Sequence, residues 1–439
     1  MRNSSESGQL FSQWCSLELP SPVRKVTLVR GARQLLTLRG PNGPRRGADL
    51  RNLGIIQDGA VLIADGLIRE VGPSRRLENL ALARGANEVD ASGRVILPGF
   101  VDCHTHLAGG TPRVSDYEMR IGGATDEQIE QAGGGPLATA RTIQELSPRT
   151  LETLALRTLE GAVRHGTTAV ETKSGLGITD AGELKILRAQ AALRELPLTL
   201  VSTFLATGAA GGTAEQLLPT LRRRNLAEFV EIEWHGAYED AAFTPAQICR
   251  YLTLARELGF GVKLNAGPRP IPGAIAAAVE FGATSVGYLL EATEGDAMLL
   301  ARSHTVATLA PGAAFHRGIC DSMVARTLID HGAAVALATG YHPAEWPSQS
   351  MQMSIALACR SLQMTPAEAI TASTINSAHA IGRADRIGSI ESGKSADLLM
   401  LNVPDYQELP YHFGVNLVDL VMSRGEMLVE RSEVKWPIQ

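Results

Sequence analysis

Residues 95–106 read VILPGFVDCHTH, an apolar run that ends in two histidines. The apolar residues from Val95 to Val101 are typical of a β-strand that is buried on both faces. Side chains two positions apart on a strand point to the same side, so His104 and His106 are expected to present two imidazoles together. The stretch therefore predicts a buried strand whose carboxyl end carries a polar site.

After this stretch, short apolar runs alternate with segments of helical periodicity, which is typical of parallel βα units. About eight such units between residues 93 and 385 predict a (β/α)8 barrel of the TIM type, in which active sites lie at the carboxyl ends of the strands. An open, doubly wound sheet is the structural alternative. The apolar runs that we expect to be strands are 169–171, 198–204, 230–234, 262–264, 285–289, 306–309 and 334–338.

The two ends of the chain have a different pattern. Residues 25–92 and 386–439 contain short alternating apolar pieces separated by Gly, Pro, Asn and Asp, as in β-strands joined by turns. We expect these segments to form one small composite β-sandwich domain. The barrel domain is predicted to span 93–385, and residues 1–24 to be an N-terminal extension.

Composition and charge exclude several classes of protein. The chain has 439 residues, of which 44% are hydrophobic, so it can bury a large core. A formal net charge of -5 without runs of like charge predicts no nucleic-acid and no membrane partner. Residues 1–20 lack the apolar core of a secretory signal. Five scattered cysteines without a C-x-x-C pair favour a reducing compartment, so we expect a cytoplasmic location.

The two histidines are candidate metal ligands. Neutral imidazole binds zinc and similar ions, and a strand end in a barrel is where such a site would lie. The alternative is that His104 and His106 are polar loop residues, because a His-x-His pattern is short and occurs by chance.

The motifs along the chain resemble those of the amidohydrolase superfamily and, within it, of the imidazolonepropionases, the ring-opening hydrolases of histidine degradation. The resemblance covers about residues 55 to 428. It implies the barrel fold, a metal-dependent hydrolysis of C–N bonds in cyclic amides, and zinc or iron as cofactor. The segments that carry it are 97–106, 122–125, 131–135, 166–175, 183–188, 372–382, 386–394 and 411–414.

The resemblance also implies which residues perform the family's chemistry, and this chain departs from the family at those positions. A metal-binding His is replaced by Asn265, and the Asp that serves as metal ligand and general base is replaced by Gly340. A second active-site His corresponds to Tyr288. The other departures are Pro268 for a pocket Glu, Gly208 for a His and Leu176 for a Tyr.

These departures bear directly on the reaction. Ring opening needs a metal that polarises water and a base that accepts the water's proton. Catalytic zinc usually has three protein ligands, whereas His104 and His106 supply two. Loss of the base alone commonly costs about 10²–10⁴ in rate. The ancestral ring-opening activity is therefore predicted to be lost or altered, and zinc or iron to be held weakly or not at all if only these two histidines bind it.

Two other positions match the family's substrate pocket. The guanidinium of Arg113 suits paired hydrogen bonds to a carboxylate, the alternative being a solvated loop residue. Lys173 matches a lysine retained at a strand end, the alternative being an ion pair with Glu171. His235 and His342 are candidate replacement metal ligands. The alternative, which the geometric demands of a metal site favour, is that His235 is a packed strand-end residue and His342 a loop residue.

Two functional hypotheses follow. The first is an amidohydrolase with a rebuilt site, with metal on His104, His106 and one or both of His235 and His342. The second is a non-catalytic paralogue that binds a small carboxylate through Arg113 or acts as a scaffold. In both, the expected partner is a small-molecule carboxylate or cyclic amide, and self-association as a homodimer is left open.

Overall fold

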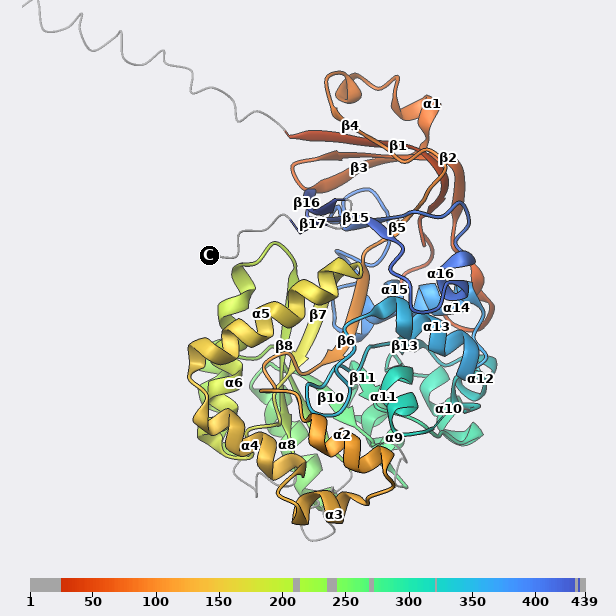
Figure 1. Cartoon of the computed structure of the whole chain (residues 1–439). Helices are drawn as coiled ribbons and strands as arrows, with labels where there is room; N and C mark the ends of the chain where they lie inside the picture. Colours follow the sequence, from red (N-terminus) through yellow and green to blue (C-terminus); the bar gives the residue numbers. More distant parts are fainter. Residues whose placement is uncertain are drawn as a thin grey trace, which may run out of the picture.

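The computed structural model describes residues 25–207, 214–234, 243–267, 272–319, 322–430 and 433–434. Eight parallel strands form one sheet in the order β13-β12-β11-β10-β9-β8-β7-β6. Its edges meet through a parallel bridge between Thr105 and Tyr341. The predicted (β/α)8 barrel is therefore confirmed (Figure 1). Its strands are β6 (Phe100–Thr105), β7 (Thr167–Lys173), β8 (Thr199–Ala206), β9 (Phe229–Glu233), β10 (Gly261–Asn265), β11 (Ser285–Gly287), β12 (Val306–Leu309) and β13 (Val335–Leu337).

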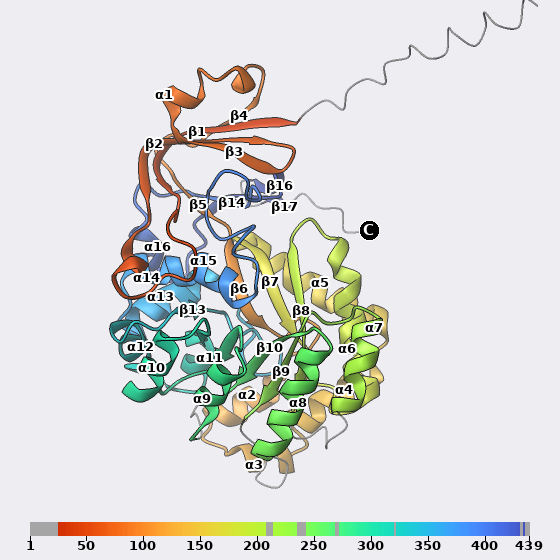
Figure 2. The ribbon, with the colours of Figure 1, turned by 180° about the vertical axis from the view of Figure 1, so that it is seen from behind.

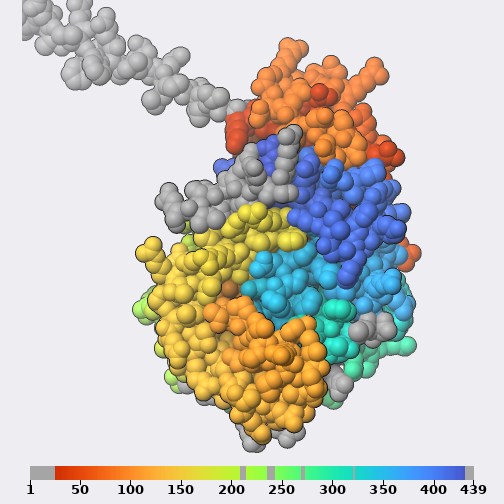
Figure 3. Space-filling view, in the orientation of Figure 1, coloured from red at the N-terminus to blue at the C-terminus, as the bar shows by residue number. Residues whose placement is uncertain are grey.

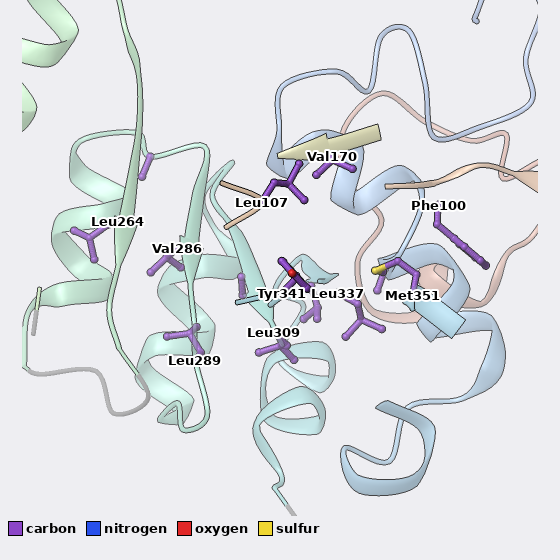
Figure 4. Packing of buried hydrophobic residues seen from close by; sticks show 14 of the residues in the cluster. Phe100, Leu107, Val170, Leu264, Val286, Leu289, Leu309, Leu337, Tyr341 and Met351 are labelled. Atoms are coloured by element: carbon purple, nitrogen blue, oxygen red, sulfur yellow. The ribbon is translucent and has the colours of Figure 1, made fainter. Parts of the chain in front are cut away.

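Helices surround the barrel (Figures 1 and 2). In α5, apolar residues at helical spacing are buried, and the Ser147 side chain caps the first turn by accepting from the Thr150 amide. Strand and helix side chains together form one large core, part of which is drawn in Figure 4. No helix in the described ranges is both long and apolar enough to span a bilayer. The surrounding helices are α5 (Pro148–Arg164), α6 (Asp180–Ala192), α7 (Ala214–Arg223), α8 (Pro245–Glu257), α9 (Ala274–Glu280), α10 (Glu294–Ala301), α11 (Pro311–His316), α12 (Val324–Asp330), α13 (Met351–Ser361), α14 (Pro366–Ala372) and α15 (Ile375–Ala380).

A second sheet is built from both ends of the chain, as predicted. Hydrogen bonds join its strands into one mixed sheet in the order β17-β16-β15-β14-β5-β1-β2-β3, with β4 paired to β1. It lies at the amino end of the barrel strands (Figures 1 and 2). Its strands are β1 (Val26–Leu36), β2 (Ile55–Ala64), β3 (Leu67–Pro73), β4 (Asn87–Asp90), β5 (Val95–Pro98), β14 (Leu398–Leu401), β15 (Val418–Ser423), β16 (Glu426–Glu430) and β17 (Glu433–Val434). Short helices near or within this part are α1 (Ser74–Leu77), α16 (Glu408–Tyr411) and the 3-10 turns Gly47–Arg51 and Ala81–Ala83; a third 3-10 turn, Leu193–Glu195, follows α6.

The apolar run from Val95 to Val101 is two strands and not the single strand that we expected. Val95–Pro98 is β5 of the mixed sheet, whereas β6 of the barrel begins at Phe100. The break falls at Gly99, where a Cβ atom would lie 2.0 Å from the Thr168 hydroxyl oxygen on β7. Only glycine therefore lets the chain pass this closely as it leaves one sheet and enters the other.

Three helices that the sequence did not predict cover the carboxyl end of the barrel. They are α2 (Val114–Ile121), α3 (Asp126–Gln131) and α4 (Gly135–Glu145), and we call the segment 111–146 the cap. The cap spans the end of the molecule opposite the mixed sheet (Figures 1 and 3). Its last helix is fixed by Lys185 of α6, whose ammonium donates to three carbonyl groups, those of Ile143, Gln144 and Leu146.

A network of four buried charges lies inside the barrel. Glu171 accepts hydrogen bonds from Lys173 at 3.0 Å and from Lys263 at 2.6 Å, and Lys173 also pairs with Glu231. The exposed fraction of each side chain is at most 2%. Burial lowers the pKa of Lys173, but the two carboxylates outweigh burial and hold it above its ordinary value. The network is thus electrically balanced.

Replacing Glu171 with Gln should destabilise the fold strongly. The substitution leaves two buried ammonium groups with Glu231 as the only carboxylate of the network, so one positive charge is uncompensated and the free energy of unfolding should fall by about 3–5 kcal/mol. Chemical denaturation is the measurement. The control is Glu215→Gln, because Glu215 forms its ion pair with the exposed Arg250 and should contribute about 1 kcal/mol or less. Equal effects for the two variants would contradict the importance of the buried network.

Replacing Gly99 with Ala should also destabilise the protein, by about 1–3 kcal/mol, because the added methyl group overlaps Thr168. Thermal denaturation of Gly99→Ala, Thr168→Ala and the double variant is the measurement. The double variant should recover part of the loss, since it removes the nearest atoms of the overlap. Strictly additive effects would show that the contact with Thr168 is not the cause.

Candidate functional site

A cavity of about 450 Å³ lies at the carboxyl end of the barrel, beneath the cap. Residues at or just beyond the strand ends, among them His104, His106 and Asn265, line it from one side. Arg113, Asp116 and other cap residues line it from the opposite side. The cavity therefore occupies the place where a barrel carries its active site.

The two histidines of the first strand lie together in this cavity, as the residue spacing predicted. Their ring centroids are 5.6 Å apart, and both side chains are buried. His106 Nδ1 lies 3.1 Å from the Ser174 carbonyl oxygen and must donate to it, which leaves Nε2 with its lone pair. Burial lowers the pKa of His104 well below its ordinary value and that of His106 to about 3. Both imidazoles are therefore neutral at neutral pH.

His342 joins this pair, while His235 lies outside the described residues. The His342 ring is 5.2 Å from that of His106. Its Nδ1 accepts from the amides of Ala344 and Glu345, both at 3.2 Å. The structure thus gathers three neutral imidazoles on one side of the cavity.

The positions where the family's catalytic residues are expected also line the cavity, but they carry other groups. The Asn265 carboxamide oxygen accepts from the Gly267 amide at 3.0 Å. Gly340 has a φ of 68°, and a Cβ atom there would lie 2.9 Å from the Ala310 methyl group. Pro268 and Gly208 lie outside the described residues, and Leu176 lines the cavity.

These residues do not fit the metal that the fold implies. Within the described ranges, no group of three or more His, Cys, Asp or Glu side chains is arranged to hold an ion. The Asn265 carboxamide oxygen already accepts a hydrogen bond from the Gly267 amide, and Gly340 has no side chain. A catalytic zinc site usually has three protein ligands, and the described residues of this cavity do not form such a set.

Arg113 lines the cavity, whereas Lys173 does not. Arg113 forms a bidentate ion pair with Asp116, with its Nε and one terminal nitrogen at 2.6 and 2.9 Å from the carboxylate oxygens. Asp116 also accepts from the Gly135 amide, which joins the first turns of α2 and α4. Lys173 lies in the buried charge network, where it forms an ion pair with Glu171. The structure therefore contains the ion pair that was the alternative to substrate binding.

The wall beside Tyr288 was not foreseen from the sequence. The Arg317 guanidinium lies 5.7 Å from the Tyr288 ring centroid and forms an ion pair of 2.7 Å with Glu345. Burial raises the pKa of Tyr288, and it also raises that of Glu345, but His342 and Arg317 outweigh it and lower the Glu345 pKa to about 2. These residues come from loops after three different strands, and no spacing in the sequence relates them.

Comparison with known proteins places this geometry in a family. Residues 95–428 match the model of the Amidohydrolase family. Imidazolonepropionase of Symbiobacterium thermophilum is 38% identical over 423 residues, covering 93% of this chain and 98% of the relative. The corresponding protein of Chloroflexus aggregans is 39% identical over 424 residues, covering 92% and 98%.

Solved structures share the fold at low sequence identity. A triazine hydrolase variant has a TM-score of 0.68 at 14% identity, covering 94% of this chain and 96% of its own. An adenosine deaminase from Xanthomonas campestris with bound zinc has a TM-score of 0.62 at 18% identity, covering 93% and 94%. The matches over nearly the whole length show that the chain belongs to the amidohydrolase family, among relatives that are imidazolonepropionases.

Proposed function

We propose that this protein is an imidazolonepropionase-like amidohydrolase whose cavity binds a small cyclic amide carrying a carboxylate, and whose ancestral ring-opening activity is lost or altered. One observation carries the proposal: the cavity is formed, but Asn265 and Gly340 stand where the family has a metal-binding His and a general base. Binding needs the cavity, whereas hydrolysis by the family route needs those two groups.

The chemistry of the cavity suits a polar ring. Three neutral imidazoles offer hydrogen-bond donors and acceptors to an amide, which has one group of each kind. The guanidinium of Arg113 has five N–H groups, of which the hydrogen bonds to Asp116 use two. The remaining N–H groups can contact a ligand carboxylate.

A rebuilt hydrolase is the second candidate, and one observation favours it. His342 lies within 5.2 Å of His106, ring to ring, so a modest rearrangement would bring a third imidazole to a zinc or iron ion on His104 and His106. A stoichiometric metal that is lost in His342→Ala, but retained in the helix-end control His331→Ala, would favour this candidate over the first.

The purified protein should contain well under one equivalent of zinc or iron and should not open the ring of imidazolone propionate above background. The reason is that two imidazoles hold a divalent ion weakly and that Gly340, at the family's base position, carries no carboxylate. Elemental analysis and a spectrophotometric assay are the measurements. Turnover on the order of 1–10³ per second, an ordinary enzymatic rate, would overturn the proposal.

The variant Gly340→Asp belongs to the same test and should not restore activity. An Asp at this position would have to adopt the left-handed backbone of Gly340, and its Cβ atom would lie too close to Ala310. The variant should therefore also lower the free energy of unfolding by about 1–3 kcal/mol. Gly123→Asp is the matched control, because Gly123 has a φ of 89° with no atom within 4 Å of an added Cβ. The difference between the variants isolates the contact with Ala310.

Arg113→Ala should weaken the binding of a propionate-bearing heterocycle by about ten- to a hundredfold, because a charge-assisted hydrogen bond contributes roughly 1.5–3 kcal/mol. Arg113→Lys should recover only part of the affinity, since lysine lacks the planar fork. Isothermal titration calorimetry is the measurement. The control Arg120→Ala removes a second, half-buried cavity cation that is paired with the exposed Asp126; an equal loss there would indicate a general charge effect and count against a specific role for Arg113.

A further inference from the structure

Tyr288 has an unusual backbone conformation at the edge of the cavity. Its φ is 66°, in the left-handed region that bulky residues rarely adopt. The residue directly follows β11, which ends at Gly287. Strained conformations of this kind persist only where the surroundings impose them, and they concentrate at ligand and active sites. The strain is therefore consistent with a functional role for the Tyr288 side chain in the cavity.

The surroundings hold the Tyr288 ring in one place. It packs against the apolar cluster that contains Ala310, Ala313 and Trp346. The Arg317 guanidinium lies over its face at 5.7 Å, and Glu345 fixes that guanidinium by an ion pair. The His104 ring centroid is 6.3 Å away. The ring thus lies between this apolar cluster and the Arg317 guanidinium, near the His104 ring.

The hydroxyl group of Tyr288 has no partner in the described part of the chain. Tyr288 lines the cavity, and none of the hydrogen bonds among the described residues involves its oxygen. A phenol can donate one hydrogen bond and accept another. A rigid ring with a free hydroxyl in a polar cavity is a preorganised contact for a ligand.

The charges of Arg317 and Glu345 determine which kind of ligand atom can lie beside the Tyr288 hydroxyl group. Arg317 is the cation closest to the ring, and its charge is already balanced by Glu345. A ligand carboxylate at this end of the cavity would therefore meet the Glu345 carboxylate without an additional countercharge. A neutral acceptor, such as the carbonyl oxygen of an amide, is compatible with this environment.

We propose that Tyr288 is a specificity-determining residue that donates its phenolic hydrogen bond to the ring carbonyl oxygen of a cyclic amide bound beside His104. This inference rests on the proposed function, since it names one contact of the ligand that the cavity binds. It also gives a reason for the backbone strain, which places the hydroxyl at a fixed position in the cavity.

Calorimetric titration with two probes tests the contact. Hydantoin-5-propionate carries ring carbonyl groups, whereas imidazole-4-propionate carries the same side chain on a ring without them. Tyr288→Phe should weaken the binding of hydantoin-5-propionate by about three- to tenfold and leave the binding of imidazole-4-propionate unchanged. Tyr411→Phe is the matched control, because Tyr411 is 80% exposed and does not line the cavity, and it should change neither.

The outcomes separate this inference from the proposed function. Binding of both probes by the wild type, with no effect of Tyr288→Phe on either or an equal effect on both, would overturn the contact alone. Binding of neither probe by the wild type would overturn the proposed function and this inference with it. The melting temperature of Tyr288→Phe should match that of the wild type, and a large drop would assign the residue to packing instead.

Discussion

The buried pairing of Glu171 with two lysines is the interaction on which the rest of the site depends. Glu171 and Lys173 lie on β7, Glu231 on β9 and Lys263 on β10, so the network connects three strands of the barrel. Side chains alternate along a strand, and Glu233 and Asn265 therefore face the cavity two residues beyond Glu231 and Lys263. The balanced charges form the layer beneath the cavity and keep the strand ends in register.

The second constraint is the passage of the chain from one sheet to the other. Gly99 brings the backbone against Thr168 of β7, after which β6 runs the length of the barrel and delivers His104 and His106 to its carboxyl end. The chain then forms the cap before it returns to the barrel in α5. One continuous stretch thus supplies both the imidazoles at the base of the cavity and the residues that cover it.

The cavity retains the shape of an amidohydrolase site with different chemistry. Gly340 contributes no side chain, and Asn265 contributes a neutral carboxamide whose oxygen accepts a hydrogen bond from the Gly267 amide. The other groups that line the cavity include neutral imidazoles, the Tyr288 phenol, the Glu233 carboxylate and cations that are paired with carboxylates. Under the proposed function, this set would recognise a polar ring by hydrogen bonds.

The sequence by itself determined the barrel, the β-domain from both chain ends, and the meeting of His104 with His106, because hydrophobic periodicity and strand alternation are local properties.

The sequence did not separate β5 from β6, since the residues on both sides of Pro98-Gly99 are equally apolar. The cap was also missed, because α2 leaves its apolar residues Val114 and Ile121 exposed and α3 is a six-residue helix with Ile129 as its one apolar residue, so neither shows the usual amphipathic pattern. Only the tertiary structure decided that Lys173 pairs inside the barrel, that His342 approaches His106, and that Arg317, paired with Glu345, lies over the Tyr288 ring. Those contacts join residues from separate strands and loops, so they exist only after the barrel has closed.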